Sequence, residues 1–314
     1  MDYILIVPAR NEEQRLPLMM KSIINQTVTP KICVIVDDGS TDNTPKIINA
    51  LEENFTWIYH RTLPPRATET WGFSWDGGTH FAQVVSEGVK YAQEICNSQS
   101  IIYEYIAKVD ADFVLPKSYF EELISRFQSE PRLGIASGDA YYAEIKDGVI
   151  DASNITHKSV LADVPSDGAR LYRKACLDAI GGILVSYGSD SVALAKARLL
   201  NWGTKRFGEI RAFATRKSVG GGHAWRGYKF AGYEAYCLDY HPFLVLLRAG
   251  SHLLERPHYH AFAWLYGYSL GLLHRRRKIE DEQVRFYFRH QRLAELRRNA
   301  FSSIKGVFQK RTGE

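Results

Sequence analysis

Two short acidic motifs carry the residues best suited to chemistry in this chain. Asp37-Asp38-Gly39-Ser40-Thr41-Asp42 directly follows the apolar run 32–36, and Asp110-Ala111-Asp112 follows the run 105–109. Each motif puts carboxylates where an apolar strand reaches the edge of a sheet, and open α/β sheets bind ligands at that edge. Carboxylates gathered there repel one another unless a cation lies among them, and Mg²⁺ commonly bridges carboxylate and phosphate oxygens. The motifs therefore predict a site for a divalent metal with a nucleotide diphosphate.

The first third of the chain alternates apolar runs with helical patterns, and these elements must position the two motifs. We expect strands over residues 3–7, 32–36 and 55–60 and one ending at 110, with helices over 11–26, 44–53, 79–96 and 116–128. Alternation of strand and helix argues for a parallel sheet with helices on both faces. Residues 61–78, which contain Pro, Trp and Gly pairs, indicate an ordered loop.

The rest of the chain has a different character. We expect two paired strands at 133–137 and 140–145, a loop at 146–167, a helix at 187–201, a glycine hinge at 220–222, and helices at about 229–239, 242–255, 258–275 and 279–300. Aromatic residues make up 12% of the chain, and many of them lie after position 225. We therefore predict a first domain over residues 1–225 and a helical, aromatic and basic extension over residues 226–314.

Three motifs in a fixed order carry a family resemblance. The turn Val7-Pro8-Ala9-Arg10-Asn11-Glu12-Glu13 is followed about thirty residues later by the Asp37 motif, and the Asp-x-Asp motif comes about seventy residues after that. In this set the sequence resembles the family-2 glycosyltransferases of the GT-A fold, over about residues 1–215. The resemblance implies an α/β, GT-A-like Rossmann-type fold with a mostly parallel sheet. It also implies transfer of a sugar from a nucleotide-diphosphate donor to a hydroxyl acceptor, with inversion at the anomeric carbon.

The resemblance implies a nucleotide-sugar pocket built from the first two motifs. Pro8, Arg10 and Glu12 would line the pocket for the base and ribose. Asp38 would contact the base or ribose, with Asp37 supporting it. Taken alone, Asp37-Asp38-Gly39 is also compatible with a turn whose side chains cap backbone groups.

The resemblance further implies a divalent metal, Mg²⁺ or Mn²⁺, beside the diphosphate. Asp112 would ligate the metal through the diphosphate, Asp110 would lie near the ribose and the metal, and His223 is a candidate third ligand. A metal stabilises the negative charge that develops on the leaving nucleoside diphosphate, without proton transfer. The alternative is a surface turn for the two aspartates and an ordinary loop position for the histidine.

The acceptor needs a base, and Asp190 is the candidate. Family-2 enzymes commonly carry Glu-Asp at a helix start, after a Gly-Gly segment and an arginine-bearing strand. This chain has Ala169-Arg170-Leu171-Tyr172-Arg173, then Gly181-Gly182, then Ser189-Asp190. Asp190 fills the aspartate position, and a general base typically contributes about 10²–10⁴-fold in rate. Ser189 departs from the usual Glu and puts acceptor positioning in doubt, and a helix cap is the alternative role for Asp190.

The segment Gly222-His223-Ala224-Trp225-Arg226-Gly227 offers further candidates. Arg226 could pair with a phosphate and Trp225 could stack on a sugar. The neighbouring glycines would let the segment close over a bound donor. The segment departs from the Gln-x-x-Arg-Trp of processive synthases, so we do not expect a processive polymerase.

The charge of the chain is uneven. Its net charge is +5, but residues from Arg275 to the end carry twelve Lys or Arg against five Asp or Glu, which leaves about −2 for the rest. The aromatic stretch 257–268 ends in Arg275-Arg276-Arg277-Lys278, a pattern that suits a helix lying in a membrane interface. Packing of that helix on the sheet domain, with a solvated basic face, is the alternative.

The cellular location follows from several weaker signals. Four cysteines without a C-x-x-C pair favour reduced core thiols in a cytosolic protein. We expect no signal peptide, because the first strand starts at once. With His counted as neutral, the uncharged stretch from His258 to His274 has seventeen residues, at the lower limit for a membrane span. We expect a cytoplasmic protein, and a peripheral position on the inner face of the membrane is the alternative that the aromatic stretch leaves open.

These observations favour a metal-dependent glycosyltransferase that uses a UDP- or GDP-sugar and a glycan or lipid-linked acceptor, without nucleic acid. A nucleotidyltransferase also uses paired carboxylates and a metal, but its first loop would be Gly-rich with Lys or Arg. Here only Arg10 meets that requirement. A non-catalytic nucleotide-sugar-binding protein is a third possibility if Ser189 marks a decayed acceptor site.

Overall fold

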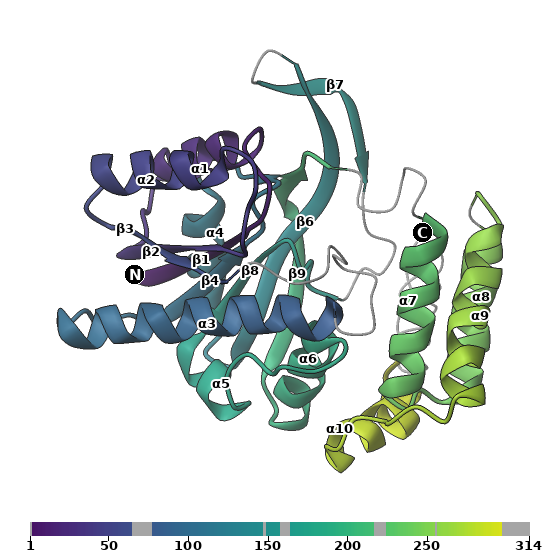
Figure 1. Ribbon diagram of the computed structural model, residues 1–314. Coiled ribbons are helices and arrows are strands. Elements are labelled where there is room, and N and C mark those ends of the chain that lie inside the picture. Colours follow the sequence, from purple (N-terminus) through teal and green to yellow (C-terminus); the bar gives the residue numbers. More distant parts are fainter. Residues whose placement is uncertain are drawn as a thin grey trace, which may run out of the picture. The chain divides into compact units, whose positions relative to one another are not determined.

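The chain folds into two compact units. The computed structural model describes residues 2–64, 77–146, 149–157, 164–216, 224–254 and 256–296. One unit consists of Met1–Val185 with Ser189–Ser218, and the other of Ser186–Gly188 with Val219–Glu314 (Figure 1). The proposed domain division between residues 225 and 226 stays a prediction.

A mixed sheet forms the centre of the first unit. The described strands make one nine-stranded sheet in the order β3-β2-β1-β4-β8-β6-β9-β5, with β7 paired to β6. One half is parallel and consists of β1 (Tyr3–Ala9), β2 (Ile32–Asp37), β3 (Ile58–Thr62) and β4 (Tyr105–Val109). Parallel strands end at a common edge, so the carboxyl ends of β1, β2 and β4 meet where the acidic motifs begin.

Antiparallel pairs extend the sheet beyond β4. These strands are β8 (Ala169–Arg173), β6 (Leu133–Lys146), β9 (Gly203–Ala214), β5 (Phe113–Val114) and β7 (Val149–His157). β8 lies antiparallel between β4 and β6, while β6 and β9 are parallel. The predicted α/β, GT-A-like fold is confirmed, with a sheet that is parallel in the half that the sequence motifs occupy.

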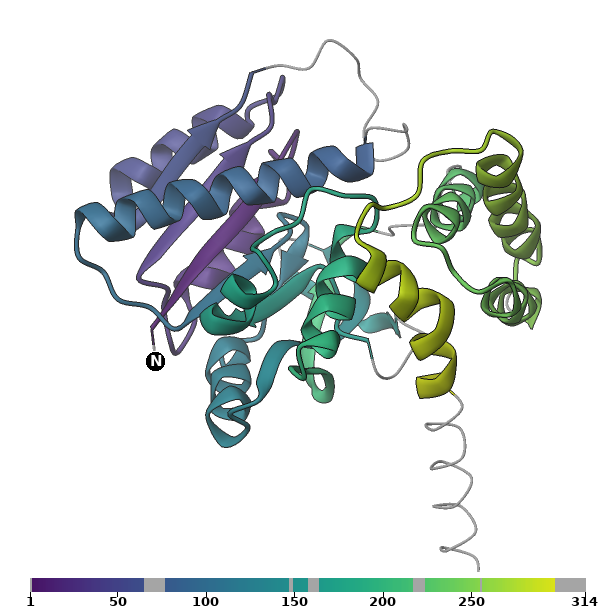
Figure 2. The same cartoon turned by 90° about the horizontal axis from the view of Figure 1, so that it is seen from below.

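Helices cover both faces of the sheet (Figures 1 and 2). They are α1 (Leu16–Ile24), α2 (Thr44–Asn54), α3 (Gly77–Ser98), α4 (Tyr119–Ser129), α5 (Lys174–Ala179) and α6 (Ser189–Leu199). Successive side chains of strand β1 point to opposite faces of the sheet, and both faces are buried. Leu5 and Val7 point into the core shared with α1 and α4, while Ile4 and Ile6 point into the core shared with α3 and α6.

Two expectations about the strands are wrong. Residues 133–137 and 140–145 are not two paired strands but parts of the single strand β6, whose register with β9 shifts between Gly138 and Asp139. A Cβ atom at Gly138 would lie 2.4 Å from the carbonyl oxygen of Ile210, so the glycine permits a close approach rather than a turn. The loop expected at 146–167 is also wrong in part, because β7 lies within it and pairs with β6.

The second unit is helical. It contains α7 (Ala224–Cys237), α8 (Pro242–Leu254), α9 (Tyr259–Leu273), α10 (Glu282–Phe286) and the π-helical turn η1 (Tyr287–Gln291). Helices α7 and α9 approach closely because Gly232 and Gly267 face the backbone of the opposite helix, where a Cβ atom would clash. None of the helices in the described part of the chain is both long enough and apolar enough to cross a bilayer.

Candidate active site

The first two motifs meet at one edge of the sheet. Ala9 at the end of β1 pairs in register with Asp37 at the end of β2, and the backbone N–H of Asp38 donates to the Ala9 carbonyl at 2.9 Å. Next to them, β4 ends directly before Asp110, whose N–H donates to the Gly168 carbonyl at 2.8 Å. The strand ends therefore bring the Asp37 and Asp110 motifs to the same side of the sheet, as the sequence predicts.

The buried side chain of Asp38 contacts Arg10 and His80. Its carboxylate is 3.7 Å from Arg10 Nη1 and accepts a hydrogen bond from His80 Nε2 at 2.7 Å. Asp37 is also buried, and its Oδ1 accepts hydrogen bonds from the amide and hydroxyl of Ser40. Asp37 thus shapes the turn while Asp38 faces Arg10. His80 was missed, because nothing in its position at the start of α3 marks it as a partner of the second motif.

A second cluster joins Asp112, Arg216 and Glu12. Arg216 ion-pairs with Glu12, and its Nε lies 3.8 Å from Asp112 Oδ2. Thr215 fixes this position, since its amide and hydroxyl donate to the Asp112 carbonyl at 2.8 and 2.9 Å. Burial raises the pKa of Glu12, and the lowering effect of Arg216 offsets only part of that rise. Arg216 was not predicted from the sequence; it lies two residues after the end of β9, a strand that was also not predicted.

Lys108 links Asp110 to Asp167. Its Nζ lies 2.8 Å from Asp110 Oδ1 and 3.2 Å from Asp167 Oδ1, and it donates to the Asp167 carbonyl at 2.9 Å. The lysine is buried within β4, so burial alone would lower its pKa. The carboxylates Asp110 and Asp167 outweigh that effect and raise the pKa of Lys108, which therefore carries a positive charge. A lysine inside an otherwise apolar strand was the signal that could have identified it.

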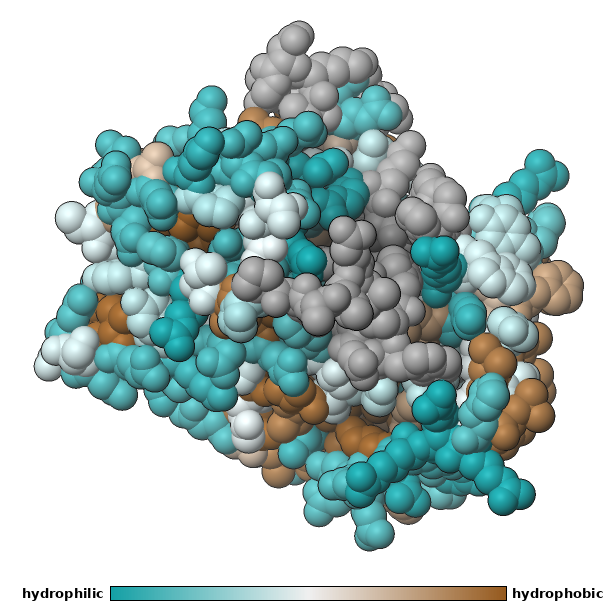
Figure 3. Space-filling view, viewed as in Figure 1, coloured by the Kyte–Doolittle hydropathy of each residue, from teal (hydrophilic) through white to brown (hydrophobic). Residues whose placement is uncertain are grey.

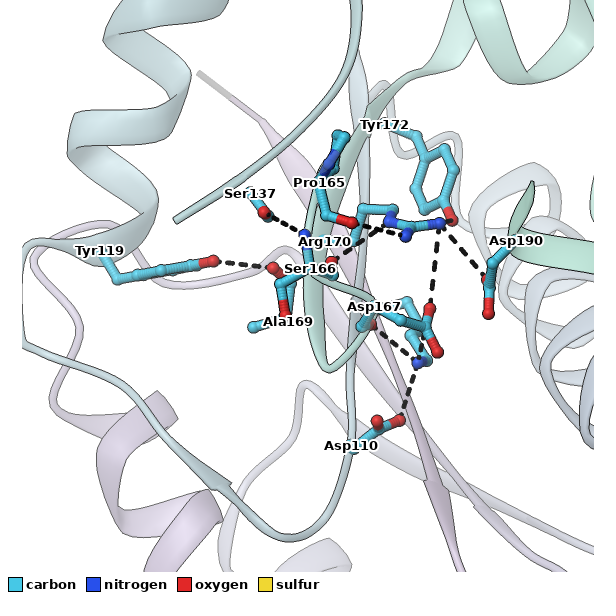
Figure 4. A network of polar contacts seen from close by, with 11 residues as sticks. Asp110, Tyr119, Ser137, Pro165, Ser166, Asp167, Ala169, Arg170, Tyr172 and Asp190 are labelled. Carbon is cyan, nitrogen blue, oxygen red and sulfur yellow. Dashed lines mark hydrogen bonds and ion pairs between the residues drawn. The ribbon is translucent and has the colours of Figure 1, made fainter. Parts of the chain in front are cut away.

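Arg170 continues the network from β8 towards α6. Its guanidinium is buried and lies 3.3 Å from Asp190 Oδ1 and 3.8 Å from Asp167 Oδ1. It also donates to the carbonyls of Pro165 and Ser166 at 3.0 and 3.3 Å (Figure 4). Backbone carbonyls hold the guanidinium in place, so the direction of its charge towards the two carboxylates is fixed.

The carboxyls of Asp167 and Asp190 have opposite pKa shifts. Burial raises the pKa of Asp190 to about 8, and the charge of Asp167 adds to the rise against the attraction of Arg170. Burial also acts on Asp167, but Lys108 and Arg170 outweigh it and hold the pKa of Asp167 below its usual range. The two side chains share a hydrogen bond. Asp167 is thus the ionised member, and Asp190 is the member whose pKa lies near neutral pH.

The described side chains supply only part of the ligand set that a metal ion needs. Among the described residues, no three His, Cys, Asp or Glu side chains lie close enough together to hold a metal ion. Asp110 and Asp112 are near enough for the charge of Asp112 to raise the pKa of Asp110. Two carboxylates suit Mg²⁺ or Mn²⁺ when diphosphate oxygens and water complete the shell. The third candidate ligand, His223, lies outside the described residues.

The other predicted site residues have the following positions. Pro8 is buried in β1, opposite Val36 of β2. Trp225 and Arg226 belong to α7 in the second unit. The Trp225 ring packs against Tyr259 and Tyr266 of α9, with centroids 6.3 and 6.1 Å apart. Their predicted contact with diphosphate, sugar or acceptor stays a prediction.

Comparisons with known proteins show what this sheet and its edge resemble. Residues 4–68, which span β1, β2 and the Asp37 motif, match the model of glycosyl transferase family 2. Over these residues the chain is similar to glycosyl transferase family 2.

Individual relatives add to this. The 4,4'-diaponeurosporenoate glycosyltransferase of Staphylococcus aureus (strain USA300) is 33% identical over 139 residues, which are 44% of this chain and 31% of that protein. The chain therefore spans less than a third of the curated relatives it matches.

Two solved structures share the fold. The mannosyltransferase PcManGT from Pyrobaculum calidifontis, in complex with GDP-Man and Mn²⁺, has a TM-score of 0.53 and 16% identity, covering 86% of this chain and 75% of that chain. S. aureus TarS 1-349 has a TM-score of 0.51 and 17% identity, covering 94% of this chain and 83% of that chain. At this level of identity the likeness shows the fold alone.

Proposed function

We propose that this chain transfers a sugar from a nucleotide-diphosphate donor to a hydroxyl acceptor. The observation that carries the proposal is the meeting of the Asp37 and Asp110 motifs at the carboxyl ends of β1, β2 and β4. Ligands of open α/β sheets bind at such an edge. Arg10, Lys108 and Arg216 lie among these acids and offset part of their negative charge. The edge is therefore not uniformly negative, which favours binding of an anionic ligand.

Asp190 is the proposed general base for the acceptor. A base works best when its pKa lies near the working pH, and burial beside Asp167 gives Asp190 such a pKa. Arg170 orients the carboxylate through its contact with Oδ1. Once deprotonated, Asp190 takes the proton of the acceptor hydroxyl as the oxygen attacks the anomeric carbon. The bond to the diphosphate then breaks on the opposite face, which inverts that carbon.

Asp110 and Asp112 are the proposed holders of Mg²⁺ or Mn²⁺, with His223 as a further candidate. The bound metal would neutralise the charge that develops on the leaving diphosphate. Arg10 and Asp38 face each other beside the predicted nucleotide pocket, and Glu12 pairs with Arg216 next to Asp112. We assign these side chains to donor binding.

UDP- and GDP-sugars are the proposed donors. One solved relative of the same fold, S. aureus TarS 1-349, is in complex with UDP-GlcNAc, and PcManGT is in complex with GDP-Man and Mn²⁺. A glycan or a lipid-linked alcohol is the proposed acceptor, and the cytoplasmic face of a membrane is the proposed location.

A product assay tests the proposal. The chain is incubated with Mn²⁺ and UDP-GlcNAc or GDP-mannose, with water or an added alcohol as acceptor, and the products are identified by mass spectrometry. Release of UDP or GDP with a free or transferred sugar is expected. A product that retains the nucleotide would instead indicate a nucleotidyltransferase, and binding without any turnover would indicate a non-catalytic binding protein.

The Asp190→Asn variant sharpens the assay. It removes the base but keeps the size of the side chain, so turnover is expected to fall about 10²–10⁴-fold while donor binding stays within about twofold. Asp178→Asn, an exposed carboxylate that pairs with Lys174, is the matched control. Full turnover in Asp190→Asn would overturn the assignment of the base.

A further inference from the structure

Helix α9 presents an apolar stripe to solvent. Tyr259, Phe262, Tyr266 and Leu273 lie three, four and seven residues apart, which places them on one side of the helix. All four are exposed, Phe262 by 61% and Leu273 by 76%. The opposite side of α9 is buried within the second unit. A helix of a globular protein normally covers its apolar side, so this exposed stripe has a different use.

Helix α8 shows the same arrangement. Its buried side consists of Leu244, Val245 and Ala249. Its exposed side carries large apolar residues at helical spacing, namely Phe243, Leu246, Leu247, Leu253 and Leu254. The two helices pack together, and Trp264 Nε1 of α9 donates to the Val245 carbonyl of α8 at 3.2 Å. We call the exposed sides of α8 and α9 the α8–α9 apolar face. Figure 3 shows hydrophobic residues gathered over these helices.

Positive charge borders the α8–α9 apolar face. Arg275, Arg276 and Arg277 lie just after α9 and are exposed, and Arg277 also ion-pairs with Glu280. Over residues 224–278 the sequence has eight Lys or Arg against three Asp or Glu. One of these acids, Asp239, is buried and already neutralised by Lys278 and Arg289 at 2.6 and 2.9 Å. The border of the face therefore has an excess of positive charge, although Glu280, Asp281 and Glu282 follow the basic segment.

We infer that the α8–α9 apolar face docks on an anionic lipid surface. Exposed Leu and Phe side chains insert at the boundary between headgroups and acyl chains, while nearby Lys and Arg contact lipid phosphates. Tyr259 and Tyr266 suit the headgroup level, where an aromatic ring with a hydroxyl meets both phases. Helices of 13 and 15 residues lie along such a surface rather than across it.

A second copy of the chain is the competing occupant. Burying this face between two copies would bring the same basic segment of each copy to the edge of the interface, where like charges repel. An anionic lipid surface satisfies both the apolar stripes and the cations. This inference stands apart from the proposed sugar transfer, because it uses residues of the second unit only.

Vesicle flotation of the full chain tests the inference. The probes are vesicles of phosphatidylcholine alone and of phosphatidylcholine with phosphatidylglycerol, at low and high salt. Binding to the anionic vesicles is expected, with weaker binding at high salt and little to neutral vesicles. Binding that is equal on both vesicles, or absent from both, would overturn the inference.

Two variants separate the apolar and the charged contributions. Phe262→Gln with Leu273→Gln removes two exposed apolar side chains, and Arg275→Gln with Arg277→Gln removes two cations. The charge variant is expected to bind about 25-fold more weakly, since each cation near an anionic surface contributes roughly fivefold. The apolar variant is expected to bind at least about tenfold more weakly.

Matched controls come from the first unit. Ile102→Gln changes an apolar side chain that is 82% exposed, and Lys46→Gln with Lys90→Gln removes two exposed cations. These controls should bind like the unaltered chain, and circular dichroism should show that every variant keeps its helices. Light scattering of the unaltered chain and of the apolar variant completes the test. If the unaltered chain is a dimer that does not bind vesicles, and Phe262→Gln with Leu273→Gln makes it monomeric, the face belongs to a second copy and the lipid assignment is overturned.

Discussion

Asp190 owes its character to two neighbours of opposite charge. Burial raises the pKa of Asp190, the negative charge of Asp167 adds to the rise, and Arg170, 3.3 Å away, lowers it. Lys108 and Arg170 keep Asp167 ionised. The reactivity assigned to one carboxyl is therefore set by three residues on β4, β8 and the segment before β8.

The first prediction concerns the pH dependence of turnover. Asp190 must be deprotonated to act as a base, so kcat/KM of the unaltered chain is expected to rise with pH and level off above about 8. Asp167→Asn removes the charge that raises the pKa of Asp190 and leaves the attraction of Arg170. The rising limb should therefore shift to lower pH. Asp178→Asn should leave the profile in place, and an unshifted profile in Asp167→Asn would contradict the coupling.

The second prediction concerns Lys108 and stability. Lys108→Met leaves Asp110 and Asp167 near each other without the cation between them. Loss of one partner from a buried pair is costly, but both carboxylates keep some contact with solvent, so we expect a loss of about 1–3 kcal/mol in the free energy of unfolding. Urea denaturation measures it. Lys90→Met, which removes an exposed pair with Glu87, should change stability by less than about 0.5 kcal/mol. Equal effects would contradict the role of Lys108.

At the residue scale the sequence identifies the acids better than their partners. Asp37, Asp38 and Asp110 stand directly after apolar runs, and a parallel sheet brings such positions to one edge. Arg216 contacts Glu12 across 204 residues of sequence, and no local pattern predicts a contact of that span. The same is true of His80 beside Asp38.

At the scale of elements, the strands with local signals were predicted, β6 was predicted as two strands, and β5, β7 and β9 were not predicted. β1 and β2 are short apolar runs between turn residues, which single them out. β9 is half exposed and carries several charged residues, so it lacks such a run. Helix α1 begins at Leu16 rather than near residue 11, because Asn11 takes a left-handed φ of 54° and the chain turns before the helix starts.

The third prediction concerns Gly138 in β6. A Cβ atom there would lie 2.4 Å from the Ile210 carbonyl oxygen and 2.7 Å from the Tyr119 ring. Both neighbours are held in the core, so Gly138→Ala is expected to lower the free energy of unfolding by about 1–3 kcal/mol. Gly208→Ala on β9 is the matched control, since nothing lies within 4 Å of its Cβ position. Similar stability of the two variants in urea would contradict the close approach of β6 and β9.

At the scale of the whole molecule, the two units carry different kinds of surface. The first collects acids and buried cations at the edge of its sheet, which suits a small anionic ligand with a metal. The second exposes apolar helix sides beside a basic segment, which suits an extended anionic surface. The sequence predicted this contrast from the aromatic and basic composition after residue 225. For residues 257–278 the sequence left two alternatives open, packing on the sheet domain and contact with a membrane surface. It could not decide between them because the exposure of a helix face depends on the tertiary arrangement.

The central claim is that carboxylates from separate strand ends bind a metal with a nucleotide diphosphate. Isothermal titration of UDP-GlcNAc and GDP-mannose, with Mn²⁺ or with a chelator, measures it most directly. One donor is expected to bind with Mn²⁺ and to bind at least about tenfold more weakly with the chelator or in Asp112→Asn, while Asp178→Asn binds as the unaltered chain does. Donor affinity that is the same in Asp112→Asn and unaffected by the chelator would contradict the claim.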